Sequence, residues 1–332
     1  MKNNMDNQNN IIKFESVAEY LCPKLKYALS KIPDEIKALA SEIRLKVGKL
    51  PYVIYSNKIY FLPDTNHTSN FILTEDLTQC LRIMCNYSVY SFQEQLKEGF
   101  ITIKSGHRVG ICGTAVIKEN NISGIKNITS LNIRIAREFK NCSKEIFENI
   151  SNYSGGILIA GPPGCGKTTL LRDLGRLISS DKKNHQKVTI VDERMEIASC
   201  FEGKPELDIG LCDVLSGFPK SEGIIRAVRC LSPSIIICDE IGSEKDAQAI
   251  IQSLNSGVRI IASIHAENKN QFIHKPQAQK LLSSGAFEKI IFLNNTPSTN
   301  MIKNIYEAGN IYDEICRNDY CGPLGSFSRN FG

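Results

Sequence analysis

No stretch of the 332 residues approaches the roughly 18 consecutive apolar residues of a transmembrane helix, and the opening MKNNMDNQNN has no apolar core like that of a signal peptide. We therefore expect neither a membrane span nor a leader. Tryptophan is absent, aromatic residues make up 8% of the chain, and the formal net charge is only +5. These values argue against a basic groove with stacking platforms, so no nucleic-acid partner is expected.

The 12 cysteines are scattered singly, and no two of them form a CxxC pair. Several lie in apolar runs, as Cys238 does in SIIICDE, where a reduced thiol behaves as a small apolar side chain. This usage favours a reducing compartment, so the expected localisation is cytoplasmic.

Hydrophobic patterning divides the chain into two domains of different type. Residues 42–49 alternate as a strand, and PYVIYSNKIYFL predicts a hairpin that turns at Ser56-Asn57. Further along, short apolar strands alternate with helical stretches, which is typical of a parallel sheet buried on both faces. The predicted boundaries are 1–12 for a disordered start, 13–140 for an α+β domain, 141–154 for a linker, 155–318 for an α/β domain and 319–332 for a tail.

The segment GPPGCGKTT matches the phosphate-binding pattern G-x-x-x-x-G-K-[ST] in full, between the apolar GILIA and a helical stretch. Glycines let the backbone curl so that its N–H groups face phosphates, and a helix N-terminus adds partial positive charge. A lysine supplies a full charge, and a threonine hydroxyl can bind Mg²⁺. The predicted nucleotide-binding residues are Gly161, Pro162, Pro163, Gly164, Cys165, Gly166, Lys167, Thr168 and Thr169.

The run SIIICDEIG supplies the carboxylates that such a loop needs. Asp239, at the strand end, is placed to hold Mg²⁺ together with Thr168, and Glu240 is placed to polarise the attacking water. The sequence therefore predicts nucleotide hydrolysis. No N-K-x-D tetrad is present, which favours ATP over GTP.

Two further strands end in polar residues at the same predicted edge. KVTIVDERMEI carries Asp192, Glu193 and Glu196, one of which would face the γ-phosphate or metal; the alternative is a solvated turn. His265 ends RIIASIH, where it would sense the γ-phosphate unless it is a structural histidine.

In this order, SGHRVGICG, SLNIRIARE, the phosphate-binding loop, VDERMEIA and residues 213–250 together resemble the stage III sporulation protein AA family. That family resembles the hexameric ATPases of type II and type IV secretion and of pilus motors. The resemblance implies an α/β fold, with a RecA-like P-loop ATPase domain behind a smaller α+β domain. It also implies that ATP and Mg²⁺ are used.

Site roles follow from the resemblance only where residues match. Lys167, Glu240 and His265 match catalytic positions, and Glu193 matches an acidic box whose alignment is ambiguous by one residue. Arginines of an N-terminal domain complete the site in such motors, and Arg134 and Arg137 of NIRIARE, with Arg108, are the candidates; a solvated strand face is the alternative.

The resemblance further implies a hexamer on the mother-cell side that docks on a membrane-embedded sporulation channel complex and energises its assembly or transport through it. Two alternatives remain open at the level of sequence. One is a RecA-like motor stimulated by nucleic acid, and the other is a scaffold protein that needs nucleotide but not its hydrolysis.

Overall fold

The computed structural model describes residues 2–62, 71–88, 92–150, 153–294 and 301–317. It divides the chain into an N-terminal unit, Met1–Arg137 with Ser199–Leu207, and a C-terminal unit, Glu138–Ala198 with Asp208–Gly332. The predicted tail at 319–332 lies outside the described residues. No described helix combines the length and the apolar character that crossing a bilayer requires.

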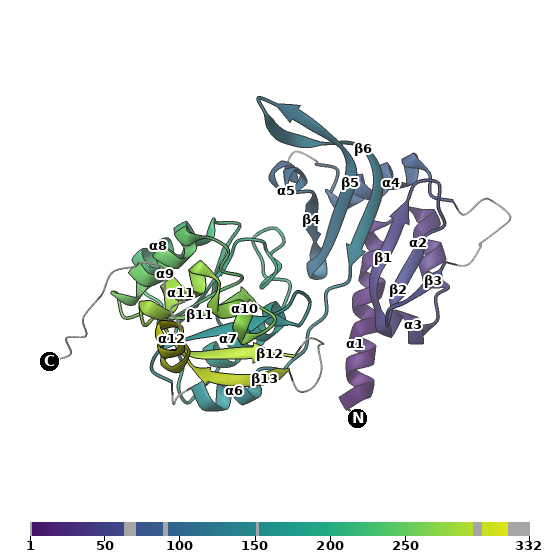
Figure 1. Ribbon diagram of the computed structural model, residues 1–332. Helices are drawn as coiled ribbons and strands as arrows, with labels where there is room; N and C mark the ends of the chain where they lie inside the picture. The colour runs from purple at the N-terminus through teal and green to yellow at the C-terminus, as the bar shows by residue number, and fades with distance from the viewer. Residues whose placement is uncertain (1, 63–70, 89–91, 151–152, 295–300, 318–332) are drawn as a thin grey trace. The chain divides into compact units, whose positions relative to one another are not determined.

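The N-terminal unit is built on a six-stranded antiparallel sheet in the order β3-β2-β1-β6-β5-β4 (Figure 1). Its helices bury their apolar faces, together with the sheet, in one core that includes Phe14, Ile43 and Leu77. The elements are α1 (Lys2–Ser16), η1 (Val17–Tyr20), α2 (Pro23–Ser30), α3 (Asp34–Leu39), β1 (Ala40–Lys46), β2 (Tyr52–Tyr55), β3 (Lys58–Phe61), α4 (Thr74–Met84), α5 (Gln93–Lys97), β4 (Phe100–Ile103), η3 (Lys104–Gly106), β5 (His107–Lys118) and β6 (Asn121–Arg134).

The start of the chain differs from the sequence-based expectation, because helix α1 occupies most of the stretch predicted to be disordered. Its C-terminal end is anchored by Phe14, whose side chain is buried, and the Lys37 ammonium lies 2.8 Å from the Glu15 carboxylate. The C-terminal end of α1 packs in the core of the N-terminal unit, and the Asn-rich residues continue the helix toward the N-terminus. The predicted hairpin is confirmed: Ser56 and Asn57 have φ of 42° and 62°, and β2 pairs with β3 on either side of them.

The C-terminal unit contains a seven-stranded sheet in the order β13-β12-β7-β11-β10-β8-β9. All neighbouring strands are parallel except β12 and β13, as the apolar strands predicted. Its elements are α6 (Lys144–Asn149), β7 (Gly156–Gly161), α7 (Lys167–Ser179), β8 (Val188–Asp192), β9 (Asp213–Ser216), α8 (Lys220–Leu231), β10 (Ile235–Cys238), α9 (Glu244–Leu254), β11 (Arg259–His265), α10 (Lys269–Ile273), α11 (Pro276–Ser283), β12 (Phe287–Leu293), β13 (Ile302–Glu307) and α12 (Ala308–Arg317).

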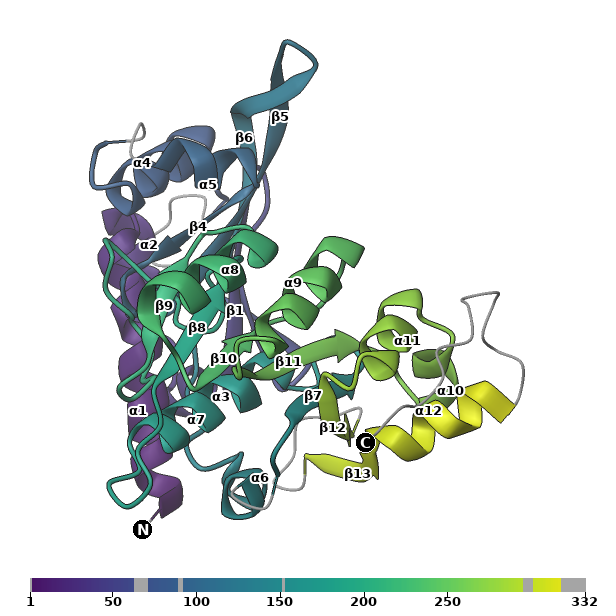
Figure 2. The ribbon, with the colours of Figure 1, turned by 90° about the vertical axis from the view of Figure 1, so that its left-hand side faces the viewer.

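Helices cover both faces of this sheet (Figure 2). Side chains that alternate along each strand pack against the two helical layers. On β10, Ile236 and Cys238 belong to the core cluster that α8, α9, α11 and α12 share. Ile237 points the other way, toward α7, where a Cβ on Gly175 would lie 3.0 Å from its Cδ1. The loops at the strand ends are therefore carried by a core that is closed on both sides.

The excursion at Ser199–Leu207 is a feature that sequence reasoning missed. After β8 the chain enters the N-terminal unit, where the Phe201 ring lies 6.5 Å from that of Phe92 and the Ser105 N–H donates to Glu206 at 2.6 Å. It then returns to the C-terminal unit to form β9. The two predicted domains are thus joined by three chain crossings rather than one.

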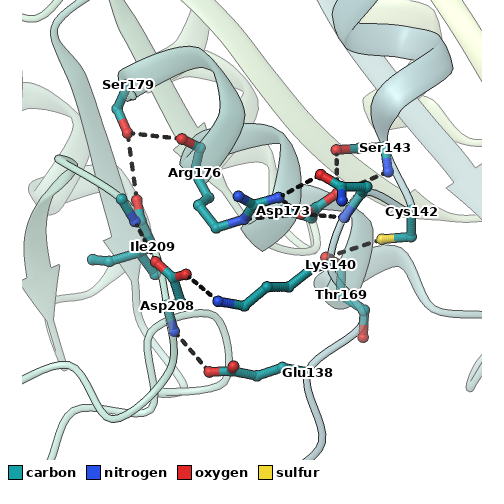
Figure 3. A network of polar contacts seen from close by, with 12 residues as sticks. Glu138, Lys140, Cys142, Ser143, Thr169, Asp173, Arg176, Ser179, Asp208 and Ile209 are labelled. Atoms are coloured by element: carbon teal, nitrogen blue, oxygen red, sulfur yellow. Dashed lines mark hydrogen bonds and ion pairs between the residues drawn. The ribbon is translucent and has the colours of Figure 1, made fainter. Parts of the chain in front are cut away.

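Figure 3 shows how helix α7 holds the segment at 138–143, all within the C-terminal unit. The buried Asp173 carboxylate accepts hydrogen bonds from the backbone of Asn141 and Ser143, each at 2.9 Å, from the Ser143 hydroxyl, and from Arg176. Lys140 pairs with Asp208 at 2.7 Å. The predicted linker therefore begins as a fixed part of this unit and contains α6.

Replacing Asp173 with Asn removes the charge that these donors share. Burial acts to raise the pKa of Asp173, but the bonds from Ser143, Arg176 and Asn141 outweigh it and lower the pKa. A lowered pKa contributes stability above the unfolded-state value of about 3.9, and this stability is lost as pH falls through the folded value. We expect the variant to lose about 1–3 kcal/mol at pH 7, measured by urea unfolding followed by circular dichroism.

The difference from wild type should shrink below about pH 4. The exposed Asp213 supplies the control, since Asp213→Asn should stay close to wild type at both pH values. An Asp173→Asn midpoint equal to that of wild type at pH 7 would show that the network contributes nothing.

Candidate active site

The loop between β7 and α7 has the backbone conformation that the glycine pattern requires. Gly164 and Gly166 have φ of 72° and 98°, a region that residues with a side chain rarely adopt. A Cβ at Gly161 would approach the buried Cys165 Sγ to 2.6 Å, so this position needs glycine for space. The Lys167 ammonium donates to the carbonyls of Gly161 and Pro162, at 2.9 and 2.8 Å.

Asp239, the residue after β10, joins this loop to the neighbouring strands. The Thr168 hydroxyl donates to one carboxylate oxygen at 2.9 Å, and the Ser263 hydroxyl of β11 donates to the other at the same distance. The Glu240 N–H also donates to Asp239, at 2.9 Å. The structure thus brings together Thr168 and Asp239, the two residues predicted to hold magnesium. A hydroxyl and a carboxylate oxygen are hard donors of the kind that Mg²⁺ prefers, so the donor set fits that ion.

Of the three candidate acids at the end of β8, Asp192 is buried, Glu193 is open and Glu196 is of intermediate exposure. Asp192 is 1% exposed and accepts the backbone N–H groups of Glu196, Ile197 and Ala198 at 2.8 to 3.1 Å. Burial raises the pKa of Asp192, and these amides oppose the shift. The Glu193 side chain is 41% exposed. Asp192 therefore shapes the turn, whereas Glu193 is the acid available to a ligand.

Lys220, which sequence reasoning missed, lies between the two acidic strand ends. It is the first residue of α8 and is buried, and its ammonium donates to the Glu240 carbonyl and lies 3.4 Å from the Glu193 carboxylate. A signal for it exists in the sequence: a lysine in the first turn of a helix opposes the helix dipole and calls for a specific anion nearby.

His265 ends β11 directly beside the phosphate-binding loop, in register with Gly161. Its Nε2 is buried and has no hydrogen-bond partner among the described residues. Leaving a buried polar atom without a hydrogen bond costs free energy, so the position of His265 favours a role in binding a polar group of a ligand.

The predicted arginines belong to the N-terminal unit and differ in how they are held there. Arg134 has a side chain that is 64% exposed, and its Nε lies 3.4 Å from the Glu42 carboxylate. Arg137 is half-buried and donates to the carbonyls of Ala38 and Ala40, which fixes the α3–β1 junction. Arg108 stacks on the Phe100 ring at 3.8 Å. Of the three, Arg134 is the one that is open to a ligand.

A family model described as sporulation stage III, protein AA matches residues 12–311. The chain is 36% identical over 300 residues to the stage III sporulation protein AA of Bacillus subtilis. The aligned region covers 89% of this chain and 96% of that protein. It is also 34% identical over 192 residues to the uncharacterized protein ycf45 of Cyanidium caldarium, of which it spans about half, 54%. The resemblance drawn from the motifs is therefore confirmed.

Solved structures with a similar fold include the ATPase DotB of Legionella pneumophila, with a TM-score of 0.57, 15% identity, and coverage of 89% of this chain and 82% of that one. The pilus retraction motor PilT, solved with bound ADP, also has a TM-score of 0.57, with 16% identity and 86% coverage of both chains. These likenesses confirm the predicted fold class, a RecA-like P-loop domain with a parallel sheet behind an α+β domain.

The two neighbouring acids should respond differently to loss of charge. Asp192→Asn deprives three backbone amides of a carboxylate partner and should cost about 1–3 kcal/mol of unfolding free energy, measured by urea denaturation. Glu193→Gln changes a side chain that is 41% exposed and weakens its ion pair with Lys220, so its loss should be smaller, up to about 1 kcal/mol. Equal losses in the two variants would contradict the division into a structural and an available acid.

Proposed function

This chain belongs to the sporulation stage III protein AA family, and we propose that it is an ATP-hydrolysing motor. The observation that carries the proposal is the 2.9 Å hydrogen bond between Thr168 and Asp239, which joins a loop of phosphate-binding geometry to the acidic strand end. The likeness in fold to the ATPase DotB and to the pilus retraction motor PilT, the latter solved with ADP, supports it.

In the proposed site, the backbone at 161–169 and the Lys167 ammonium bind the phosphates. Thr168 and Asp239 hold Mg²⁺, which supplies positive charge to the transferring phosphoryl group when it is bound. Glu240, whose carboxylate has no hydrogen-bond or ion-pair partner among the described residues, orients the attacking water and takes its proton. His265 donates to the γ-phosphate, and Glu193 provides the second carboxylate.

The arginine of the proposed mechanism is Arg134, since Arg137 is engaged with the backbone carbonyls of Ala38 and Ala40. A cation that reaches the γ-phosphate only when domains close ties hydrolysis to motion, because the developing charge is then stabilised only in the closed state. We place this closure within a hexamer, as proposed from the family resemblance.

The proposed cellular role is to energise assembly of, or transport through, the mother cell–forespore channel during sporulation. The protein would work on the mother-cell side and reach the membrane through an embedded partner complex. This setting rests on the family to which the chain belongs.

Glu240→Gln should separate hydrolysis from binding. The amide cannot accept the proton of water, so turnover should fall by about 10²- to 10⁴-fold, measured by phosphate release, while affinity for a fluorescent ATP analogue stays close to wild type. Lys167→Ala is the counterpart that should lose binding itself.

The same variants decide between the motor and its alternatives. A scaffold would still support spore formation as Glu240→Gln, whereas a motor would not. Strong stimulation of the wild-type rate by single-stranded DNA or RNA would instead favour a nucleic-acid motor.

Arg134→Ala should keep nucleotide binding and lose turnover by about 10²- to 10³-fold, because the arginine acts on charge that develops during the reaction. Arg44→Ala is the matched control, since Arg44 pairs with the same Glu42 carboxylate, at 2.7 Å. In wild type, the rate per subunit should rise with protein concentration if sites form between subunits. An Arg134→Ala enzyme with full turnover would remove this residue from the site.

A further inference from the structure

Lys220 occupies an unusual position for a lysine. Its side chain is only 7% exposed, although lysine is rarely buried without a specific partner. It is also the first residue of α8, where the helix dipole disfavours a cation. Both costs must be offset by what the ammonium contacts.

The ammonium contacts the backbone of Glu240, the residue proposed to activate water. It donates to the Glu240 carbonyl, while the Glu240 N–H donates to Asp239 at 2.9 Å and the next N–H, of Ile241, donates to Ser263 at 2.8 Å. The main chain that carries the Glu240 side chain is therefore held on both sides. Without Lys220, the carbonyl of Glu240 would lose this anchor.

The same ammonium lies 3.4 Å from Glu193, the available acid of the neighbouring strand β8. One buried cation thus reaches the two acidic strand ends, β8 and β10, which are adjacent in the sheet. Its charge also reduces the repulsion between Glu193 and the acids at 239–240 on the adjacent strand end.

The geometry points to Lys220 as a positioning residue for the proposed hydrolysis, one that fixes the Glu240 backbone and the Glu193 carboxylate in their working places. This inference rests on the proposed function and adds to it a residue outside the motifs. Lys220 acts through the two glutamates. A misplacement of the water-activating group by about 1 Å is enough to lower turnover about 10²-fold.

Lys220→Met tests this role, because it keeps the length of the side chain and removes the ammonium. We expect kcat to fall by about 10- to 100-fold while the dissociation constant of a fluorescent ATP analogue changes by less than about threefold. Hydrogen–deuterium exchange of residues 238–243, which needs no turnover, should become faster. Lys220→Arg should recover part of kcat by restoring a cation.

Lys289→Met is the matched control. Lys289 is also a largely covered lysine, 14% exposed and paired with Glu307, but on the β12–β13 pair at the opposite edge of the sheet from β8. This variant should leave both kcat and exchange at 238–243 unchanged. Equal effects of the two variants would reduce Lys220 to a general contributor to stability.

Wild-type kcat in Lys220→Met, a loss confined to nucleotide affinity, or unchanged exchange at 238–243 would each overturn the assignment. If Lys220→Met does not fold, Lys220→Leu, which also removes the ammonium and keeps no donor, decides in the same assays, and wild-type kcat there overturns the assignment as well. A wild-type protein that binds ATP without hydrolysing it would instead refute the proposed motor, while the exchange comparison would still show whether Lys220 anchors the strand end.

Discussion

The carboxylate of Asp239 is the junction on which the proposed site depends. It accepts hydrogen bonds from Thr168 at the start of α7 and from Ser263 on β11, while it stands at the end of β10 itself. A single side chain thus links the phosphate-binding loop to two neighbouring strands at a fixed distance. Because the strands beneath are buried on both faces, this distance is held by the core of the unit rather than by the loop alone.

Helix α7 makes further hydrogen bonds to segments that lie away from the phosphate-binding loop. Its Arg172 donates to the carbonyls of Glu196 and Ile197, just before the chain enters the N-terminal unit at 199. Asp173 holds 141–143, just after the first crossing, and the Ser179 hydroxyl accepts the N–H of Leu211 after the last. The helix that begins at the phosphate-binding loop therefore binds the chain close to each point where it passes between the units.

Local patterns were enough to predict the parts of this molecule that depend on local chemistry. The hairpin at Ser56-Asn57 follows from residues that tolerate positive φ, and the order of loop, acidic strands and His265 follows from apolar runs that end in polar residues. The helix α1 and the excursion at 199–207 were not predictable, since both are stabilised by contacts with residues far along the chain, such as Lys37 and Phe92. The same holds for Asp192, whose three amide donors appear only once the turn has folded.

Two lysines, each the first residue of a helix, contact backbone carbonyls near the ends of two strands of the sheet. Lys167 donates to the carbonyls of Gly161 and Pro162 at the end of β7, and Lys220 donates to the carbonyl of Glu240 at the end of β10. A sheet edge that gathers several carboxylates and strand-end carbonyls is stabilised by cations. Lys167 is recognisable because a glycine pattern surrounds it. Lys220 has only its place in the first turn of a helix as a signal, because the groups that require it come from two other strands and meet only in the folded unit.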